Sequence, residues 1–271
     1  MSESAVKNGV QLLDRAVLLL DLVASAGSDG ATLKTLCELS GLNKVTCHRI
    51  LNSLVDHGFL NKMHGGKHYR LGTKLLILGV KAANGPGLRH HFQPALERIR
   101  QQTGETVMLM ARDKDDSVCI DRFDGDFQMQ TLTGSIGGFV PLGVGPGSLA
   151  ILSFLSLEER EQIIARNLPR MTGYPMLTPE RIERWIAETT EQGFAIDSGE
   201  LIPGIAGIAV PVTVSGTGTV ASLGLTLLSP RLTPELIAQH VALLREEVAK
   251  IEPMLNPLDK RLSSPERVST R

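Results

Sequence analysis

The stretch Leu42-Asn43-Lys44-Val45-Thr46-Cys47-His48-Arg49-Ile50-Leu51-Asn52-Ser53-Leu54-Val55-Asp56-His57-Gly58 decides how the N-terminal part of the chain folds. Apolar residues recur in it at the spacing of one helical face, and they are Cys47, Ile50, Leu51, Leu54 and Val55. Asn43 is a favoured residue for capping a helix N-terminus, and Gly58 can adopt the left-handed conformation that ends a helix. The stretch therefore predicts a helix between these two residues.

A shorter helix is expected directly before this one, from Thr32 to Leu39, and Ser40-Gly41-Leu42 joins the two. The outer face of the second helix carries mostly hydrogen-bond donors, and these residues are Lys44, Val45, His48, Arg49 and Asn52, with Thr46 at the margin. Two helices around a glycine-containing turn are typical of a helix-turn-helix, whose second helix enters the major groove of DNA. The alternative is a helical hairpin with an ordinary solvated surface.

A β-hairpin is expected after the second helix, with strands over 59–63 and 68–72 and a Gly-Gly turn between them. Its tip carries Lys62, His64, Lys67 and His68. A donor-rich hairpin after a recognition helix is typical of the wing of a winged helix-turn-helix, and Lys62 and Lys67 would then contact DNA phosphates. A metal site at His64 and His68 is the alternative, but the sequence offers no third ligand.

The distribution of charge supports a DNA partner for this segment. Residues 1–75 carry nine Lys and Arg against six Asp and Glu, whereas residues 76–271 carry nineteen against twenty-three. Four of the seven histidines also lie in the first segment. A basic module on an acidic body suits a polyanion that binds the module alone.

Composition excludes several other classes of protein. No apolar run approaches the ~20 residues of a membrane helix, and the N-terminus lacks the basic start and apolar core of a signal peptide. The cysteines Cys37, Cys47 and Cys119 are far apart and have no metal-ligand spacing, so we expect reduced thiols. The expectation is a cytoplasmic protein that has no metal, no cofactor and no membrane partner.

The second part of the chain begins after Asn84-Gly85-Pro86-Gly87, the clearest linker in the sequence, which follows a helix expected from Thr73 to Ala83. Helices are then expected over residues 88–103, 147–155, 158–167, 178–192 and 233–254. Strands are expected over residues 105–112, 117–123, 129–133, 194–197, 205–214 and 220–227. Grouped strands with flanking helices predict an α+β domain with a mostly antiparallel sheet.

No catalytic constellation is legible in the second part, which predicts that the protein is not an enzyme. The run Gly143-Val144-Gly145-Pro146-Gly147 lacks the GxGxxG spacing of a dinucleotide loop. We expect it to be a tight loop that leads into a helix at Ser148, where free backbone N–H groups suit an anionic ligand. Because Pro146 has no N–H group, Gly147 and the residues after it would be the donors.

The first helix, expected from about residue 10 to residue 24, has an unusually broad apolar face. That face comprises Leu13, Ala16, Val17, Leu20 and Val23, and Leu12, Leu19 and Leu22 widen it. A face this broad indicates burial on two sides, against the helix-turn-helix and against a partner chain.

In this order and at these spacings, several motifs resemble those of the IclR family of bacterial transcriptional regulators, from about Val10 to Pro230. The motifs are Asp14-Arg15-Ala16, Gly41-Leu42-Asn43-Lys44 with His48-Arg49, Tyr69-Arg70-Leu71-Gly72, Thr103-Gly104-Glu105-Thr106-Val107, Gly193-Phe194 and Gly204-Ile205-Ala206-Gly207-Ile208-Ala209-Val210-Pro211-Val212.

The resemblance implies four segments: a winged helix-turn-helix over 10–72, a linker helix and hinge over 73–87, a GAF-like effector-binding and oligomerisation domain over 88–256, and a polar tail over 257–271. It further implies dimers, or dimers of dimers, that bind a near-palindromic operator and respond to a small organic acid or aromatic metabolite. By position it carries the family's ligand pocket over to Gly145, Pro146, Asp197, Gly207 and Thr226. A constitutive DNA-binding dimer and an enzyme with an attached DNA-binding module are the alternatives.

The chain departs from the family pattern at four positions. Leu12 replaces a helix-capping serine, Gly207 a frequent cysteine, Ser148 a frequent lysine and Leu228 a small polar residue. The resemblance therefore implies a roomier and more apolar pocket, which favours an aromatic or branched ligand. Four side chains are expected to rim it if they face inward, namely Met108, Met110, Met129 and Phe139.

Overall fold

The computed structural model describes residues 11–63, 65, 67–83, 87–127 and 129–255. The contacts divide the chain into two compact units, one up to residue 85 and one from residue 86. Our expectations for the extreme N-terminus, for His64, for the linker residues 84–86 and for the polar tail fall on residues outside the described ones.

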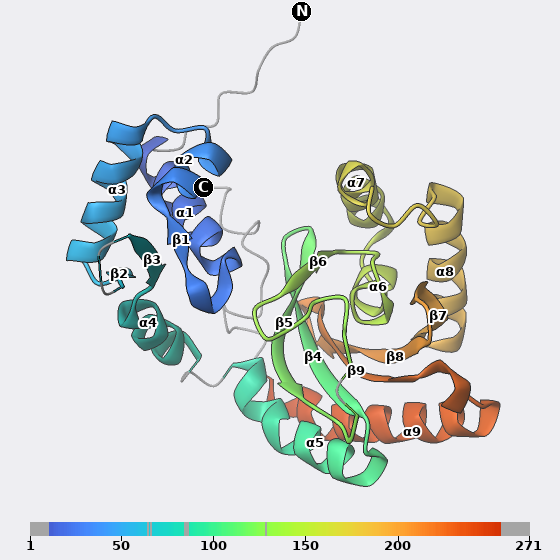
Figure 1. Cartoon of the computed structure of the whole chain (residues 1–271). Helices are drawn as coiled ribbons and strands as arrows, with labels where there is room; N and C mark the ends of the chain where they lie inside the picture. Colours follow the sequence, from blue (N-terminus) through green and yellow to red (C-terminus); the bar gives the residue numbers. More distant parts are fainter. Residues whose placement is uncertain (1–10, 64, 66, 84–86, 128, 256–271) are drawn as a thin grey trace, which may run out of the picture. The chain divides into compact units, whose positions relative to one another are not determined.

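The first unit is a winged helix-turn-helix (Figure 1). Its helices are α1 (Gln11–Ser25), α2 (Leu33–Ser40), α3 (Lys44–Asp56) and α4 (Thr73–Ala83), and a 3-10 turn spans Gly27–Asp29. Its strands β1 (Ala31–Thr32), β2 (Leu60–Lys62) and β3 (His68–Leu71) form an antiparallel sheet in the order β1-β3-β2. The hairpin of β2 and β3 is the wing that the sequence predicted.

Local signals set the bounds of the two central helices. The Thr32 side chain accepts a hydrogen bond from the Thr35 N–H group, and the Asn43 side chain accepts one from the Thr46 N–H group. Gly41 has a φ of 66° at the end of α2, in the left-handed conformation that glycine adopts most readily. The turn thus allows α3 to start at Lys44, three residues after Gly41.

The core of the first unit gathers side chains from α1, α2, α3 and the wing. It contains the predicted inner residues Cys47, Ile50 and Leu51, which pack with Leu19, Val23, Leu36, Leu60 and Tyr69. Burial raises the pKa of the Cys47 thiol to about 12, so this side chain stays protonated and acts as a small apolar residue.

The broad apolar face of α1 is only partly buried within this unit. Leu13 and Val17 are 62% and 48% exposed, whereas Leu19 and Val23 are the helix's buried residues. Leu12 and Leu18 are also exposed. The helix has more apolar residues than one buried side can use, and within the described part of this unit nothing covers the others.

The second unit is an α+β sandwich of one sheet between two layers of helices. Its helices are α5 (Leu88–Thr103), α6 (Pro146–Ser153), α7 (Leu157–Asn167), α8 (Pro179–Gln192) and α9 (Pro234–Ile251). Its strands are β4 (Thr106–Asp113), β5 (Asp116–Phe123), β6 (Phe139–Pro141), β7 (Ala195–Ile202), β8 (Ile205–Val214) and β9 (Gly218–Leu228). Short 3-10 turns span Leu168–Arg170, Ser229–Arg231 and Glu252–Met254.

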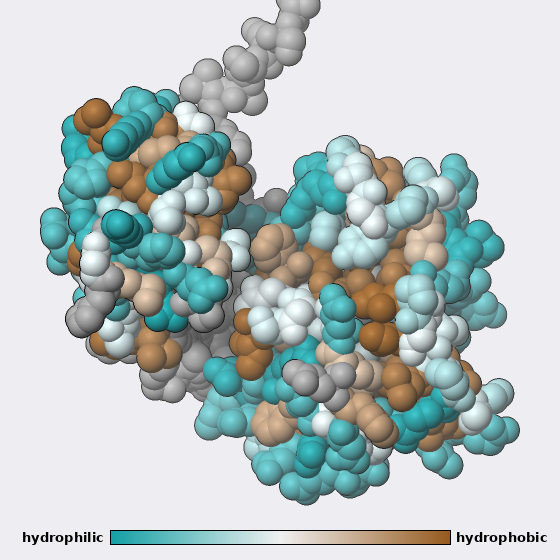
Figure 2. All heavy atoms as spheres, viewed as in Figure 1, coloured by the Kyte–Doolittle hydropathy of each residue, from teal (hydrophilic) through white to brown (hydrophobic). Residues whose placement is uncertain are grey.

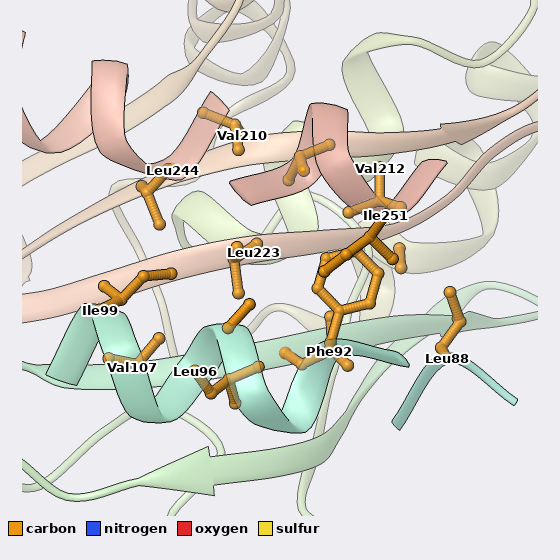
Figure 3. Packing of buried hydrophobic residues seen from close by; sticks show 14 of the residues in the cluster. Leu88, Phe92, Leu96, Ile99, Val107, Val210, Val212, Leu223, Leu244 and Ile251 are labelled. Atoms are coloured by element: carbon orange, nitrogen blue, oxygen red, sulfur yellow. The ribbon is translucent and has the colours of Figure 1, made fainter. Parts of the chain in front are cut away.

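The six strands form one sheet in the order β6-β5-β4-β9-β8-β7, and every neighbouring pair is antiparallel. Helices α5 and α9 cover one face, and α6, α7 and α8 lie on the other (Figure 1). Figure 3 shows the core under α5 and α9, where Phe92 and Leu96 meet Leu223 and Leu244. The predicted fold class, α+β with a mostly antiparallel sheet, is confirmed.

The strand expected over residues 129–133 is wrong. Those residues run as a turn-containing segment, and the strand that pairs with β5 lies later, at Phe139–Pro141. The segment at residues 129–133 instead lines a cavity. Within the described residues, no helix is long and apolar enough to cross a membrane.

Candidate DNA-binding surface and ligand cavity

The outer face of α3 carries the side chains that the sequence assigned to DNA. Lys44, Val45, His48 and Arg49 are exposed, with Val45 at 80%, while Thr46 and Asn52 are half-buried. Figure 2 shows mainly hydrophilic atoms along this outer edge of the first unit. The buried side of α3 therefore holds the helix to the core and leaves its donor-rich side facing solvent.

A chain of hydrogen bonds connects the wing to α3. The Lys62 ammonium donates to Asn52 Oδ1 at 2.9 Å, and Asn52 Nδ2 lies 3.3 Å from His48 Nδ1. Lysine can only donate, so it fixes which end of the Asn52 amide faces it, and Asn52 Nδ2 must then donate to His48 Nδ1. The neutral His48 ring consequently carries its proton on Nε2 and presents that N–H group outward.

Basic side chains converge on a hollow between the start of α2 and the wing. It has a volume of about 360 Å³ and is lined by Thr32, Leu33, Lys34, His48, Lys62, Lys67, His68 and Tyr69. The sequence predicted phosphate contacts for Lys62 and Lys67 but not for Lys34, because nothing in the sequence of α2 indicates that its first turn lies beside the wing. Three ammonium groups around one hollow suit a phosphate.

The second unit contains a cavity of about 80 Å³ between the sheet and the start of α6. All six residues expected to bind an effector line it, and they are Gly145, Pro146, Gly147, Asp197, Gly207 and Thr226. Asp197, Gly207 and Thr226 are direct partners across β7, β8 and β9, so they form one row on one face of the sheet. A single water needs only about 10–15 Å³, so the cavity has room for a small molecule.

The start of α6 lies close against this row. A Cβ atom on Gly207 would lie 3.0 Å from the Pro146 Cγ atom, and one on Gly147 would lie 2.9 Å from the Met110 Cγ atom. The expectation that Gly207 makes the pocket roomier is therefore wrong, because the Pro146 ring occupies the space that a side chain would take. The glycine permits close packing of the loop on β8.

The first turn of α6 provides free hydrogen-bond donors at the cavity. Pro146 has no N–H group, and the structure gives no acceptor to the N–H groups of Gly147 and Ser148 among the described residues. The Ser148 hydroxyl is already used, since it donates to the Val144 carbonyl at 2.8 Å and accepts from the Gly143 N–H group. The donors and the positive end of the helix dipole together favour an anionic group.

Asp197 has a structural use for its carboxylate. Its Oδ1 atom accepts from the N–H groups of Gly199 and Glu200 at 3.2 and 2.8 Å, and its Oδ2 atom accepts from that of Leu201 at 3.4 Å. Burial raises the pKa of this carboxyl, and the backbone donors counteract part of the rise. The Asp197 carboxylate therefore holds the turn formed by residues 199–201, which lies inside β7 where the pairing with β8 is interrupted.

The rest of the lining is apolar or uncharged. Met108 and Met110 face the cavity as expected, but Met129 is buried elsewhere and Phe139 is 60% exposed to solvent. The Thr226 hydroxyl has only the Met108 sulfur, 3.9 Å away, as a partner within the described residues. It is therefore free to bond a ligand, and among the described residues of the lining Asp197 is the one with a charged side chain.

Sequence reasoning missed residues 131–133, which line the cavity opposite the sheet. They were taken for a strand, and no local signal distinguishes the two cases. The structure also offers no site for a metal, because no group of three His, Cys, Asp or Glu side chains in the described part of the chain could hold one.

Two family models match the chain. Residues 12–63 match the IclR helix-turn-helix domain, and residues 80–252 match the C-terminal domain of the bacterial transcriptional regulator IclR. The DNA-binding transcriptional repressor YiaJ of Escherichia coli (strain K12) is 31% identical over 214 residues, which cover 75% of this chain and 73% of YiaJ.

Solved structures show the same fold. An IclR transcriptional regulator from Alicyclobacillus acidocaldarius superposes with a TM-score of 0.77 at 25% identity, covering 90% of this chain and 98% of the other. An IclR homolog from Microbacterium hydrocarbonoxydans, solved in complex with 4-hydroxybenzoate, gives a TM-score of 0.76 at 24% identity with the same coverage of both chains.

The hydrogen bonds of Asp197 lead to a prediction about stability. The substitution Asp197→Asn replaces one accepting oxygen by an NH₂ group that cannot accept, so a backbone N–H group of the turn loses its partner. Charge-assisted bonds of this kind stabilise by about 1.5–3 kcal/mol, so we expect the melting temperature to fall by roughly 3–10 °C. Differential scanning calorimetry measures it, with the exposed Asp113→Asn as the control. A melting temperature equal to that of the control would mean that the carboxylate does not hold the turn.

Proposed function

Because the chain belongs to the IclR family of bacterial transcriptional regulators, we propose that it binds a near-palindromic operator as a dimer or dimer of dimers and responds to a small organic acid or aromatic metabolite. The family consists of DNA-binding regulators and not of enzymes. Such a protein meets its operator in the cytoplasm, where we place it.

The exposed donor face of α3 is the observation that carries DNA binding. Lys44, His48 and Arg49 would contact base edges in the major groove, and Arg49 can make the two parallel hydrogen bonds that recognise guanine. The hollow between α2 and the wing would receive a backbone phosphate. The hydrogen bonds from Lys62 through Asn52 to His48 orient the Lys62 and His48 side chains before DNA binds, which lowers the entropic cost of binding.

The cavity beside α6 supports an effector. A carboxylate of the ligand would accept from the N–H groups of Gly147 and Ser148, and the Thr226 hydroxyl would bond a second polar atom. The apolar lining would contact a ring or a branched chain. The homolog from Microbacterium hydrocarbonoxydans holds 4-hydroxybenzoate, a compound that has both a carboxylate and a ring, and it is our first probe.

Dimerisation follows from the size of the reading surface and from two exposed apolar surfaces. One winged helix reads only a few base pairs, so a usable site needs two copies about a two-fold axis. On α1, Leu12, Leu13, Val17 and Leu18 face solvent, and on α4 the same is true of Leu76, Ile77 and Leu78. We propose that a second copy covers these residues. A DNA-binding dimer without an effector is the alternative, and ligand binding decides between the two.

The proposed contacts on DNA predict two different defects. Arg49→Ala should lose about 1–3 kcal/mol of binding to the operator and relax specificity at one base pair per half-site. Lys67→Gln should weaken binding to operator DNA and to random DNA by the same factor. Because it removes one lysine from the interface, it should also reduce the steepness of log K against log salt by about one unit. Fluorescence anisotropy at several salt concentrations measures both effects. Arg184→Ala and Lys114→Gln, in the second unit, are matched controls. An Arg49→Ala protein with wild-type discrimination would refute this docking.

The proposed effector site predicts a separation of ligand response from DNA binding. Gly207→Leu must displace the Pro146 ring and fill the cavity, so the response to 4-hydroxybenzoate should disappear while operator binding persists. Gly173→Leu is the control, because a Cβ atom there meets nothing within 4 Å. Thermal shift and operator binding, each with and without the ligand, are the measurements. A normal response in Gly207→Leu would place the effector elsewhere.

The proposed dimer surface predicts that a charged side chain on α1 weakens the dimer. Leu13→Glu places a carboxylate in the apolar contact, and we expect a dissociation constant at least roughly tenfold higher, because an unpaired buried charge costs several kcal/mol. Leu157→Glu is the control, since Leu157 is equally exposed on α7, at 61% against 62%. Sedimentation velocity over a range of concentrations gives the assembly state. A wild-type protein that is monomeric at micromolar concentration contradicts the proposed dimer.

A further inference from the structure

Arg122, the second-last residue of β5, donates several hydrogen bonds to one short segment that follows the strand. It lies on β5, and its side chain is 10% exposed. Its Nη1 atom donates to the Thr131 hydroxyl at 2.9 Å and to the Gly134 carbonyl at 2.8 Å, and its Nη2 atom donates to the Met129 carbonyl at 3.1 Å. Asp124 Oδ1 accepts from its Nε atom at 2.6 Å.

A bulge in β5 directs this guanidinium toward the cavity side of the sheet. Asp121 pairs with Leu109 and Cys119 pairs with Met110, so an extra residue separates them in β5. Asp121 therefore shares a face with Leu109 and forms an ion pair with Arg89 of α5. Arg122 pairs with Met108, whose side chain lines the cavity on the opposite face.

The segment that Arg122 holds, residues 129–134 (the cavity segment), forms one wall of the cavity. Thr131, Leu132 and Thr133 line it, and the Leu132 side chain packs directly on Gly145, where a Cβ atom would lie 2.4 Å from Leu132 Cδ1. The Thr133 hydroxyl is buried beside the Cys119 thiol of β5. This wall therefore brings an apolar contact to the place where a ligand would lie.

Besides the hydrogen bonds from Arg122, the burial of Met129 and the packing of Leu132 on the core hold the cavity segment. The next turn is tied back to β5 by the bond from the Gly137 N–H group to the Cys119 carbonyl at 2.7 Å and by the bond from the Cys119 N–H group to the Gly138 carbonyl at 2.9 Å. Between residues 129 and 134 the segment has no strand partner. A wall that lacks sheet hydrogen bonds depends on side-chain bonds for its position.

We propose that Arg122 is a positioning residue for the effector site, because it holds the cavity segment in the place that gives the cavity its shape. The inference rests on the proposed effector function, but the holding of the wall can be tested without any ligand. A lysine cannot replace the arginine, because one ammonium group cannot reach three acceptors on the segment with the geometry of a planar fork.

The first experiment uses the full-length protein without ligand. In Arg122→Leu, backbone amides of residues 131–138 should exchange with deuterium at least roughly tenfold faster than in the wild type, because several charge-assisted bonds are lost. Peroxide should also oxidise Met110 faster, since Met110 lines the cavity and is only 5% exposed. Mass spectrometry gives both rates. Unchanged exchange of residues 131–138 overturns the proposal.

Arg112→Leu is the matched control. Arg112 lies on the neighbouring strand β4, is 8% exposed, and bonds Glu159 and the Lys114 carbonyl, with no contact to the cavity segment. It should destabilise the protein without changing exchange of residues 131–138. Arg122→Lys keeps the charge and is the variant to use if Arg122→Leu does not fold. The amides of residues 131–138 should also exchange faster in Arg122→Lys than in the wild type. Exchange at the wild-type rate in Arg122→Lys would contradict the need for a planar guanidinium.

The second experiment titrates 4-hydroxybenzoate by calorimetry. Arg122→Leu should bind it roughly tenfold more weakly than Arg112→Leu does, and equal affinities would make Arg122 a merely structural residue. If the wild type does not bind this compound, the proposed aromatic effector fails. Exchange and oxidation then still decide whether Arg122 holds the wall of the cavity.

Discussion

The close approach of the start of α6 to the sheet is the constraint on which the second unit's cavity depends. Pro146 packs on Gly207 and Met110 packs on Gly147, so a side chain at either glycine would have to displace its neighbour. This packing brings the free N–H groups of the first turn of α6 to the row formed by Asp197, Gly207 and Thr226. The result is an apolar cavity with hydrogen-bond donors at one end. The directional hydrogen bonds from these donors would orient a ligand there as much as its charge would.

In the first unit, the side chains proposed to bind DNA lie on the surface and not in a cavity. A flexible lysine at the surface loses rotamer entropy when it binds a phosphate. Lys62 has lost part of that freedom already, because it bonds Asn52 and lies 5.6 Å from the centre of the Tyr69 ring. The same bonds set the tautomer of His48, so the wing and the recognition helix are prepared for DNA together.

Local signals explain why the helix-turn-helix could be predicted from the sequence. The caps at Thr32 and Asn43 and the apolar period of α3 act within a few residues. Long-range contacts explain the failures. Residues 129–133 were expected to form a strand, but they have no strand partner, and bonds from Arg122 hold them as a wall of the cavity. Nothing near Gly207 in the sequence indicates that the Pro146 ring fills the adjacent space. The six residues assigned to the effector do surround one cavity, because the resemblance carries information on tertiary structure that periodicity lacks.

The absence of a basic side chain from the cavity lining of the described structure limits the chemistry of the ligand. A carboxylate that enters the cavity loses hydration worth several kcal/mol, and two N–H donors with a helix dipole recover only part of it. The remaining affinity must come from apolar contact. Burying a ring of roughly 150 Å² contributes about 4 kcal/mol, whereas an acid of two or three carbons has little apolar area to bury. With Ser148 where a lysine is frequent in the family, we therefore expect the proposed effector to be an acid with a ring or a branched chain and not a smaller one.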